Sequence, residues 1–131
     1  MNHISYTASG FIEKYLDHFI ANNYEAISLM YNQNSCIVAK DTSYFFKDKL
    51  DVIYYYKKLF LALKIKRYKY TKILSLKEKK ISEGYWPNIV YSVFLEGQRY
   101  NDNEEKMNKL SCIYILEKMG SNYKIAFVKC V

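Results

Sequence analysis

The hydrophobic pattern of this 131-residue chain changes its period, and that change constrains the fold more than any other feature. Up to about residue 63, most apolar side chains recur at the three- and four-residue spacing of amphipathic helices, and beyond it they follow the pattern of strands. Helices followed by a run of antiparallel strands are typical of an α+β domain with helices on one face of the sheet. Because no linker or repeat interrupts the chain, we expect a single domain over residues 1–131.

Three helices are expected in the N-terminal half. The first spans about Ser9 to Asn22, and a short second helix follows Asn23, which can cap it. Asp48 can cap a third helix that extends to about Leu63. The apolar stripe of the first helix consists of Phe11, Ile12, Tyr15, Leu16, Phe19 and Ile20.

The strands are expected between and after these helices. A short one at Cys36–Ala39 follows the turn-like Asn32-Gln-Asn-Ser and returns through Tyr44-Phe-Phe. The remaining strands are predicted at about Tyr68–Lys77, Asn88–Arg99, Lys109–Met119 and Tyr123–Lys129. The turns between them are predicted at Gly84 with Trp86-Pro87, at Asn101-Asp-Asn and at Gly120-Ser-Asn.

The net charge of +7 is concentrated in one segment. Lys57 to Lys80 contains ten Lys or Arg residues and only one acidic residue, Glu78. A local basic field of this kind can attract phosphates, so weak nucleic-acid contact is one interpretation. A solvated helix end and strand face is the other.

The three cysteines, Cys36, Cys112 and Cys130, are far apart and lack metal-ligand spacing. We therefore expect buried thiols, with neither a disulfide framework nor a metal site. No apolar run is long enough to span a membrane, and the first residues lack the pattern of a signal peptide. An intracellular protein without a membrane partner or a cofactor is expected.

Several fragments, in order along the chain, resemble the nuclear transport factor 2-like family. Phe11-Ile-Glu-Lys-Tyr-Leu-Asp-His-Phe is similar to the opening helix of that family, and Ile27 to Cys36 is similar to its helix-to-strand segment. Val93-Phe-Leu-Glu-Gly-Gln, Cys112-x-Tyr-x-Leu and Tyr123-Lys-Ile-Ala resemble three of its later strands.

The resemblance implies a cone, in which about three helices pack into a strongly curved antiparallel sheet of cystatin-like type. It also implies a homodimer or a heterodimer with another such domain, formed through the sheet. In the eukaryotic branch it implies messenger-RNA export or carriage of Ran-GDP between nucleus and cytoplasm, with nucleoporin repeats as further partners. Asp102 and Glu104 match the acids that the carrier presents to Ran, but Ala39 and Lys40 replace its tryptophan and glutamate. An export-cofactor-like binding subunit therefore fits better than a Ran carrier.

The same fold also includes ketosteroid isomerases, scytalone dehydratases and SnoaL-like cyclases, which work inside the cone. Tyr15 matches the tyrosine that polarises the ketone in the isomerases. In that register Val38 stands where the general base belongs and Cys112 about where the second acid belongs. A valine cannot accept a proton, so no catalytic residue is predicted.

Two functions are left open by the sequence. The main interpretation is a non-enzymatic protein-binding subunit of nucleocytoplasmic transport, and the alternative is a SnoaL-like small-molecule-binding protein or isomerase, dehydratase or cyclase. The partner-binding candidates are Asp102, Glu104, Lys40, Tyr114 and Cys112. The pocket candidates are Tyr15, Phe19, Val38 and Tyr56.

Overall fold

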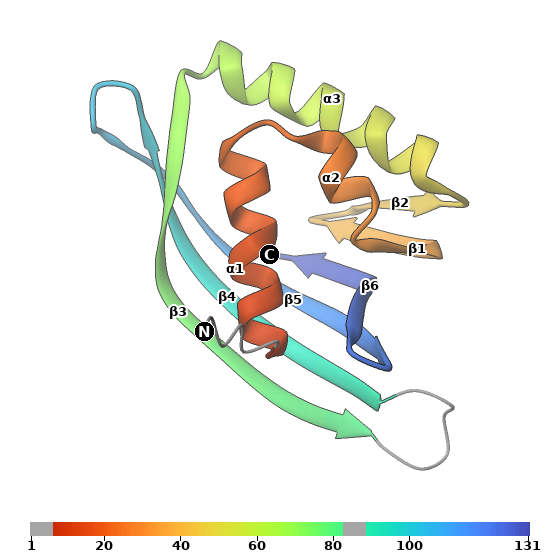
Figure 1. The fold of residues 1–131 in the computed structure, drawn as a ribbon. Helices are drawn as coiled ribbons and strands as arrows, with labels where there is room; N and C mark the ends of the chain where they lie inside the picture. The colour runs from red at the N-terminus through yellow and green to blue at the C-terminus, as the bar shows by residue number, and fades with distance from the viewer. Residues whose placement is uncertain (1–6, 83–88) are drawn as a thin grey trace, which may run out of the picture.

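The computed structural model describes residues 7–82 and 89–131, in which three helices lie on the concave side of a strongly bent sheet (Figure 1). The predicted turn at Gly84 and Trp86-Pro87 lies outside the described residues. The helices are α1 (Ala8–Ile20), α2 (Tyr24–Ser28) and α3 (Lys49–Ile65). The strands are β1 (Tyr31–Ala39), β2 (Thr42–Phe46), β3 (Tyr68–Ser82), β4 (Ile89–Asn101), β5 (Lys106–Met119) and β6 (Asn122–Cys130).

Side-chain caps fix where each helix begins. The Thr7 hydroxyl accepts a hydrogen bond from the backbone of Gly10, and Asn23 accepts one from Ala26. As predicted, Asp48 caps α3, because its carboxylate accepts from the backbone N–H of Leu50 at 3.0 Å. These caps satisfy N–H groups that have no partner inside the helix.

The sheet has the order β2-β1-β6-β5-β4-β3. All neighbouring pairs are antiparallel, as predicted, except β1 and β6, which are parallel. The prediction of a turn at residues 32–35 is wrong, because β1 already begins at Tyr31. Tertiary pairing decides this segment, since Tyr31 lies opposite Ile125 and Ser35 lies opposite Phe46.

Alternation along the strands gives the sheet an inner face toward the helices and an outer face. On β5, Cys112, Tyr114 and Leu116 are buried on the inner face, whereas Ile113, between two of them, is 38% exposed. At Gly97 of β4 the backbone lies close to the side chain of Thr71 on β3. A Cβ atom at Gly97 would lie only 2.8 Å from Cγ2 of Thr71. Within the described residues, no helix combines the length and apolar character needed to cross a membrane.

Candidate functional site

A cavity of about 260 Å³ lies inside the cone, between the helices and the inner face of the sheet. This volume is just below the roughly 300–1,000 Å³ usual for ligand pockets. The wall is mostly apolar, with aromatic hydroxyls and two kinds of cation. It is lined by Tyr15, Leu16 and Phe19 of α1, Tyr55, Tyr56 and Leu59 of α3, and Ile37, Ala39, Lys40, Thr71, Arg99, Asn108, Lys109, Leu110, Cys112, Tyr114, Val128, Cys130 and Val131.

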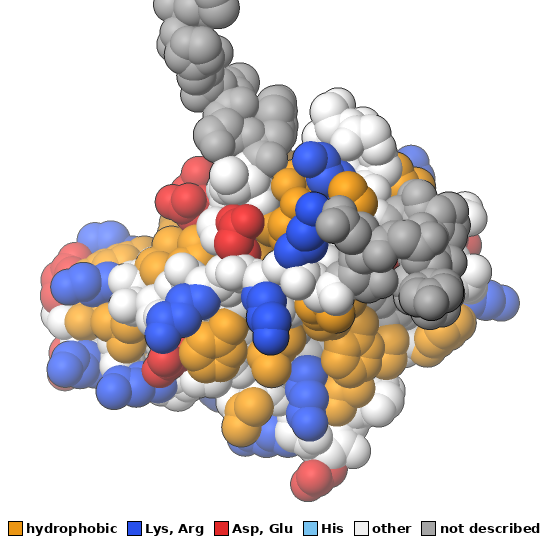
Figure 2. Space-filling view, turned by 90° about the horizontal axis from the view of Figure 1, so that it is seen from below, with side chains coloured by type: hydrophobic (Ala, Val, Ile, Leu, Met, Phe, Trp, Pro, Cys, Tyr) orange, Lys and Arg blue, Asp and Glu red, His pale blue; other side chains and the backbone are white. Residues whose placement is uncertain are grey.

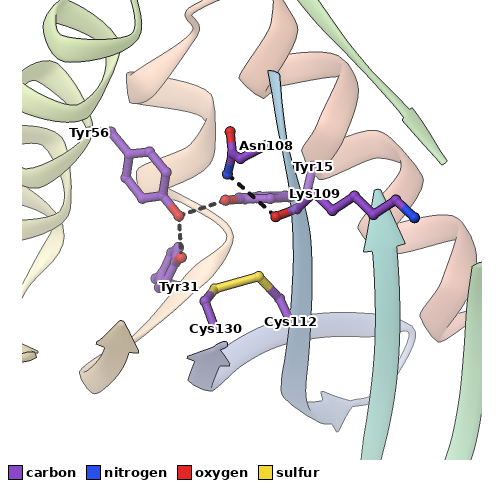
Figure 3. The surroundings of a disulfide bond; sticks show 7 residues. All are labelled: Tyr15, Tyr31, Tyr56, Asn108, Lys109, Cys112 and Cys130. Carbon is purple, nitrogen blue, oxygen red and sulfur yellow. Dashed lines mark hydrogen bonds between the residues drawn. A yellow bond between two sulfur atoms is a disulfide. The ribbon is translucent and has the colours of Figure 1, made fainter. Parts of the chain in front are cut away.

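Three buried tyrosines form a chain of hydrogen-bonded hydroxyls at this cavity (Figure 3). The Tyr56 hydroxyl lies 2.7 Å from that of Tyr15 and is also hydrogen-bonded to that of Tyr31. Each hydroxyl has one proton to donate. Two bonds use two of the three protons, so one O–H is left to donate to a further acceptor. The Tyr114 ring packs edge-on against Tyr15, with centroids 5.5 Å apart.

The surroundings keep these hydroxyls protonated. Burial raises the pKa of Tyr15, Tyr31, Tyr56 and Tyr114 well above the usual 10.0, because the charged phenolate loses its hydration. For Tyr114 the positive charge of Arg99 opposes this rise in pKa. The cluster therefore acts as a hydrogen-bond donor and not as a base.

Arg99 brings a positive charge to the inner face. Its guanidinium carbon lies 5.8 Å from the Phe19 ring centre and 5.9 Å from the Tyr68 ring centre, within range of cation–π attraction. The Nε atom of Arg99 is buried and has no hydrogen-bond partner among the described residues. No Asp, Glu or His lines the cavity in the described part of the chain, where Lys40 and Lys109 are the other charged lining residues.

A disulfide between Cys112 of β5 and Cys130 of β6 forms part of the cavity wall (Figure 3). The prediction that both are separate buried thiols is wrong. The two residues are 18 positions apart in the sequence but directly opposite each other in the β5–β6 register. Cys36 is a free thiol, and it is half-buried instead of buried.

The structure places three of the four pocket candidates, Tyr15, Phe19 and Tyr56, on the cavity wall. It places Val38 elsewhere: its neighbours Ile37 and Ala39 line the cavity instead. Because side chains alternate along a strand, a register error of one residue moves the prediction to the opposite face. Ile37 and Ala39, which line the cavity in place of Val38, have apolar side chains and cannot accept a proton either.

The partner-binding candidates are divided among three places. Tyr114 and Cys112 are each 3% exposed and face the cavity, which removes them from any protein interface on the outer face. Lys40 lies on the cavity wall at the β1–β2 turn. Asp102 and Glu104 lie in the turn between β4 and β5 and do not line the cavity.

Asp102 and Glu104 are both engaged with side chains of β3 and the residue before it. Asp102 forms an ion pair with Arg67 at 3.0 Å, and Glu104 forms one with Lys69 at 3.2 Å. The Tyr70 hydroxyl donates a hydrogen bond to Glu104 at 2.8 Å, and this bond lowers the pKa of the Glu104 carboxyl. All these groups are solvent-exposed, so the pairs contribute little to stability.

Sequence reasoning missed Arg99 and Tyr31 as functional candidates. Arg99 follows Val93, Leu95 and Gly97 at two-residue steps, a pattern that places it on the inner face. Tyr31 stands out in the sequence only as part of the segment that resembles a helix-to-strand connection. Its hydroxyl partner, Tyr56, is 25 residues away, so the contact depends on tertiary structure.

A second, larger hollow of about 480 Å³ lies outside the cone, between α1, α2 and the β5–β6 turn. Its lining includes Lys14, His18 and Lys124, and the Lys124 amine is hydrogen-bonded to the carbonyl of Leu29. Buried hydroxyls do not converge there among the described residues, which makes the cone the better candidate site.

The outer face of the sheet has a mixed surface, with apolar side chains between lysines (Figure 2). Phe45 is 61% exposed, and Val38, Phe94, Ile113 and Ile115 also belong to this face. The basic segment at residues 57–80 spans the second half of α3 and most of β3.

No protein-family profile and no curated protein sequence matches this chain. Solved structures do match its fold. A nuclear transport factor 2-like protein with a cystatin-like fold from Novosphingobium aromaticivorans has a TM-score of 0.67 at 8% identity, covering 92% of this chain and 75% of its own. Aln2 from a Streptomyces species has a TM-score of 0.68 at 5% identity, covering 92% of this chain and 84% of its own. ActVI-ORFA from Streptomyces coelicolor has the same score and identity, covering 92% and 90%.

At these identities the similarity shows the fold alone. It confirms the predicted α+β class, with helices followed by a curved six-stranded sheet. The chain therefore has the cone fold called nuclear transport factor 2-like or cystatin-like.

Proposed function

We propose that this chain binds a small, mostly apolar molecule inside its cone, as SnoaL-like binding proteins do. The observation that carries the proposal is the cavity of about 260 Å³, whose apolar wall includes the hydroxyls of Tyr15, Tyr56 and Tyr114. A cavity of roughly 150 Å³ with apolar walls is enough to hold benzene. The volume here suits a molecule of one or two rings that has an oxygen to accept a hydrogen bond from the tyrosines.

Binding without proton abstraction fits the lining better than isomerase chemistry does. In the ketosteroid isomerases a carboxylate takes the proton from the substrate. The lining side chains of the described residues include no carboxylate and no imidazole, and the buried tyrosines hold their protons. We therefore expect a binding protein without ketone-isomerase activity.

Titration with naphthol, a two-ring molecule with one hydroxyl, tests the proposal by calorimetry and by thermal unfolding. Binding should raise the melting temperature, because the ligand stabilises the folded state by mass action. Ala39→Phe, which adds a ring to the cavity wall, should abolish binding. Val38→Phe is the matched control, because it adds the same ring one position away, at a residue that does not line the cavity. Equal loss of binding in both variants, or no binding by the wild type to any such probe, would exclude the cone as the site.

A dimer through the outer face is a second proposal, supported by the exposed apolar residues there. Phe45 and Ile113 are 61% and 38% exposed, and association through this face would cover them. Ile113→Glu should convert a dimer to a monomer in analytical ultracentrifugation. A wild-type protein that sediments as a monomer at all concentrations would contradict this.

Nucleocytoplasmic transport has less support than the two proposals above. Its partner-binding residues are divided between the cavity, where Tyr114 and Cys112 are buried, and an exposed turn, where Asp102 and Glu104 pair with the chain's own cations. Co-elution with Ran-GDP or with the matching domain of an export receptor in size-exclusion chromatography would support a transport function.

A further inference from the structure

Arg99 carries one of two buried side-chain atoms that have no hydrogen-bond partner in the described part of the chain; the other, Oγ of Ser35, does not line the cavity. A guanidinium has five N–H donors, and the Nε–H of Arg99 is buried without an acceptor in the described part of the chain. Its guanidinium lies over the ring faces of Phe19 and Tyr68, which attract the charge but accept no conventional hydrogen bond. A molecule that occupies the cavity could supply the missing acceptor.

The side chains of the cavity lining offer Arg99 no counter-charge in the described part of the chain. The described lining residues include Lys40 and Lys109 but no acidic side chain, so the site has an excess of positive charge. A buried donor without an acceptor is unfavourable, and Arg99 has no acidic side chain beside it in the lining to balance its charge. An anion in the cavity would relieve both at once.

We propose that the ligand of the cone is a small aromatic or alicyclic carboxylic acid whose carboxylate binds the guanidinium of Arg99. This inference rests on the proposed function, because it names the class of molecule that the cone would bind. A planar carboxylate matches the fork of N–H groups of a guanidinium, and a charged pair of this kind is stronger than a neutral hydrogen bond.

The remaining walls suit the rest of such a molecule. Leu16, Leu59 and Leu110 offer apolar surface for a ring, and the tyrosine hydroxyls offer a donor for a second oxygen. A carboxylate monoanion balances the charge of Arg99, whereas the second charge of a phosphate dianion would have only the solvent-exposed Lys40 and Lys109 as partners in the lining.

Matched ligands test the inference on the intact protein. Naphthalene carboxylate, naphthalene carboxamide and naphthyl phosphate have the same rings but carry a monoanionic, a neutral and a dianionic group, and calorimetry gives the affinity of each. The carboxylate should bind about 10- to 100-fold more tightly than the amide, as expected for a charge-assisted bond. Arg99→Met should remove this preference, so that the carboxylate and the amide bind with similar affinity. Arg67→Met is the control, because it removes the same charge at an exposed ion pair with Asp102.

The outcomes separate the inference from the function on which it rests. If the amide and the carboxylate bind equally to the wild type, or if naphthyl phosphate binds more tightly than either, the carboxylate is overturned while the cone remains a binding site. If none of the three binds, the proposed function itself fails.

The stability of the ligand-free variants adds an independent readout. Because Arg99 has an unsatisfied donor, Arg99→Met should melt at or above the temperature of the wild type when no ligand is present. Arg99→Lys, which keeps the charge but lacks the fork, should bind the carboxylate with an intermediate affinity. A large fall in the melting temperature of both variants would show that Arg99 serves the fold, and would overturn its assignment to a ligand.

Discussion

The inner and outer faces of the same sheet differ in chemistry, although they alternate residue by residue. On β5 the inner residues Cys112 and Tyr114 are buried at the cavity, and Ile113 between them is 38% exposed beside Phe94 and Lys129. On β1 the inner Ile37 and Ala39 line the cavity, and Val38 between them does not. The comparison shows that the register of each strand decides which residues can meet a small ligand and which can meet a protein.

Alkaline pH should cause the largest loss of stability, because it acts on the buried tyrosines of the inner face. Burial raises the pKa of Tyr15, Tyr31, Tyr56 and Tyr114 above 10.0, so above that pH the folded chain holds protons that the unfolded chain releases. Stability is then fully present below pH 10 and falls as the pH rises further, by up to about 1.4 kcal/mol per pH unit for each tyrosine. The part of the tyrosinate absorbance that comes from these four buried tyrosines should appear only as the circular dichroism signal of the folded chain is lost. Ionisation of these tyrosines near pH 10 without loss of structure would contradict the prediction.

Leu116→Ala, on the inner face, should lower the free energy of unfolding of the protein by about 2–5 kcal/mol, because it opens a cavity at a residue that is 0% exposed. Ile113→Ala, on the outer face of the same strand, should cost about 1 kcal/mol or less. Denaturant unfolding of both variants at a concentration where the protein is monomeric gives the comparison. Equal losses would show that the two faces are packed alike.

Removal of the Cys112–Cys130 disulfide should cost about 3 kcal/mol, given its 18-residue separation. Cys130→Ser removes it, and Cys36→Ser is the control on a thiol that is free. Alkylation of the denatured, unreduced protein should modify one of its three cysteines. Modification of all three without reduction would show that the bond does not form.

Tyr56→Phe should cost about 1–3 kcal/mol, less than loss of Leu116 or of the disulfide, because it leaves the buried hydroxyls of Tyr15 and Tyr31 without their shared partner. Tyr54→Phe is the matched control on the same helix, at a side chain that is 62% exposed. A cost no larger than that of the control would mean that the hydroxyl chain adds nothing to stability.

Local patterns were sufficient to predict most of the fold. Helical spacing predicted α1, Asp48 predicted the start of α3, and alternation predicted the four later strands within a few residues of their bounds. These features depend on neighbours close in the sequence, and this is why the sequence alone shows them.

The rest depends on contacts between distant segments. The polar run at residues 32–35 reads as a turn, but pairing with β2 and β6 makes it a strand. The prediction placed Val38 at the cavity, but its neighbour Ala39 lies there. The disulfide could not be predicted because Cys112 and Cys130 meet only through the pairing of β5 with β6. Because the three thiols are no longer all free, the cysteines give no reason to place the protein in a reducing compartment.

Methyl-detected NMR during a titration with naphthol tests the central claim most directly, because inner and outer residues report separately. Binding inside the cone predicts shifts at Ile37, Leu110 and Val128, which line the cavity. Ile113 and Ile115, which do not line it, should remain unchanged. Shifts confined to Ile113 and Ile115, or no shift at any methyl group, would contradict a binding site inside the cone.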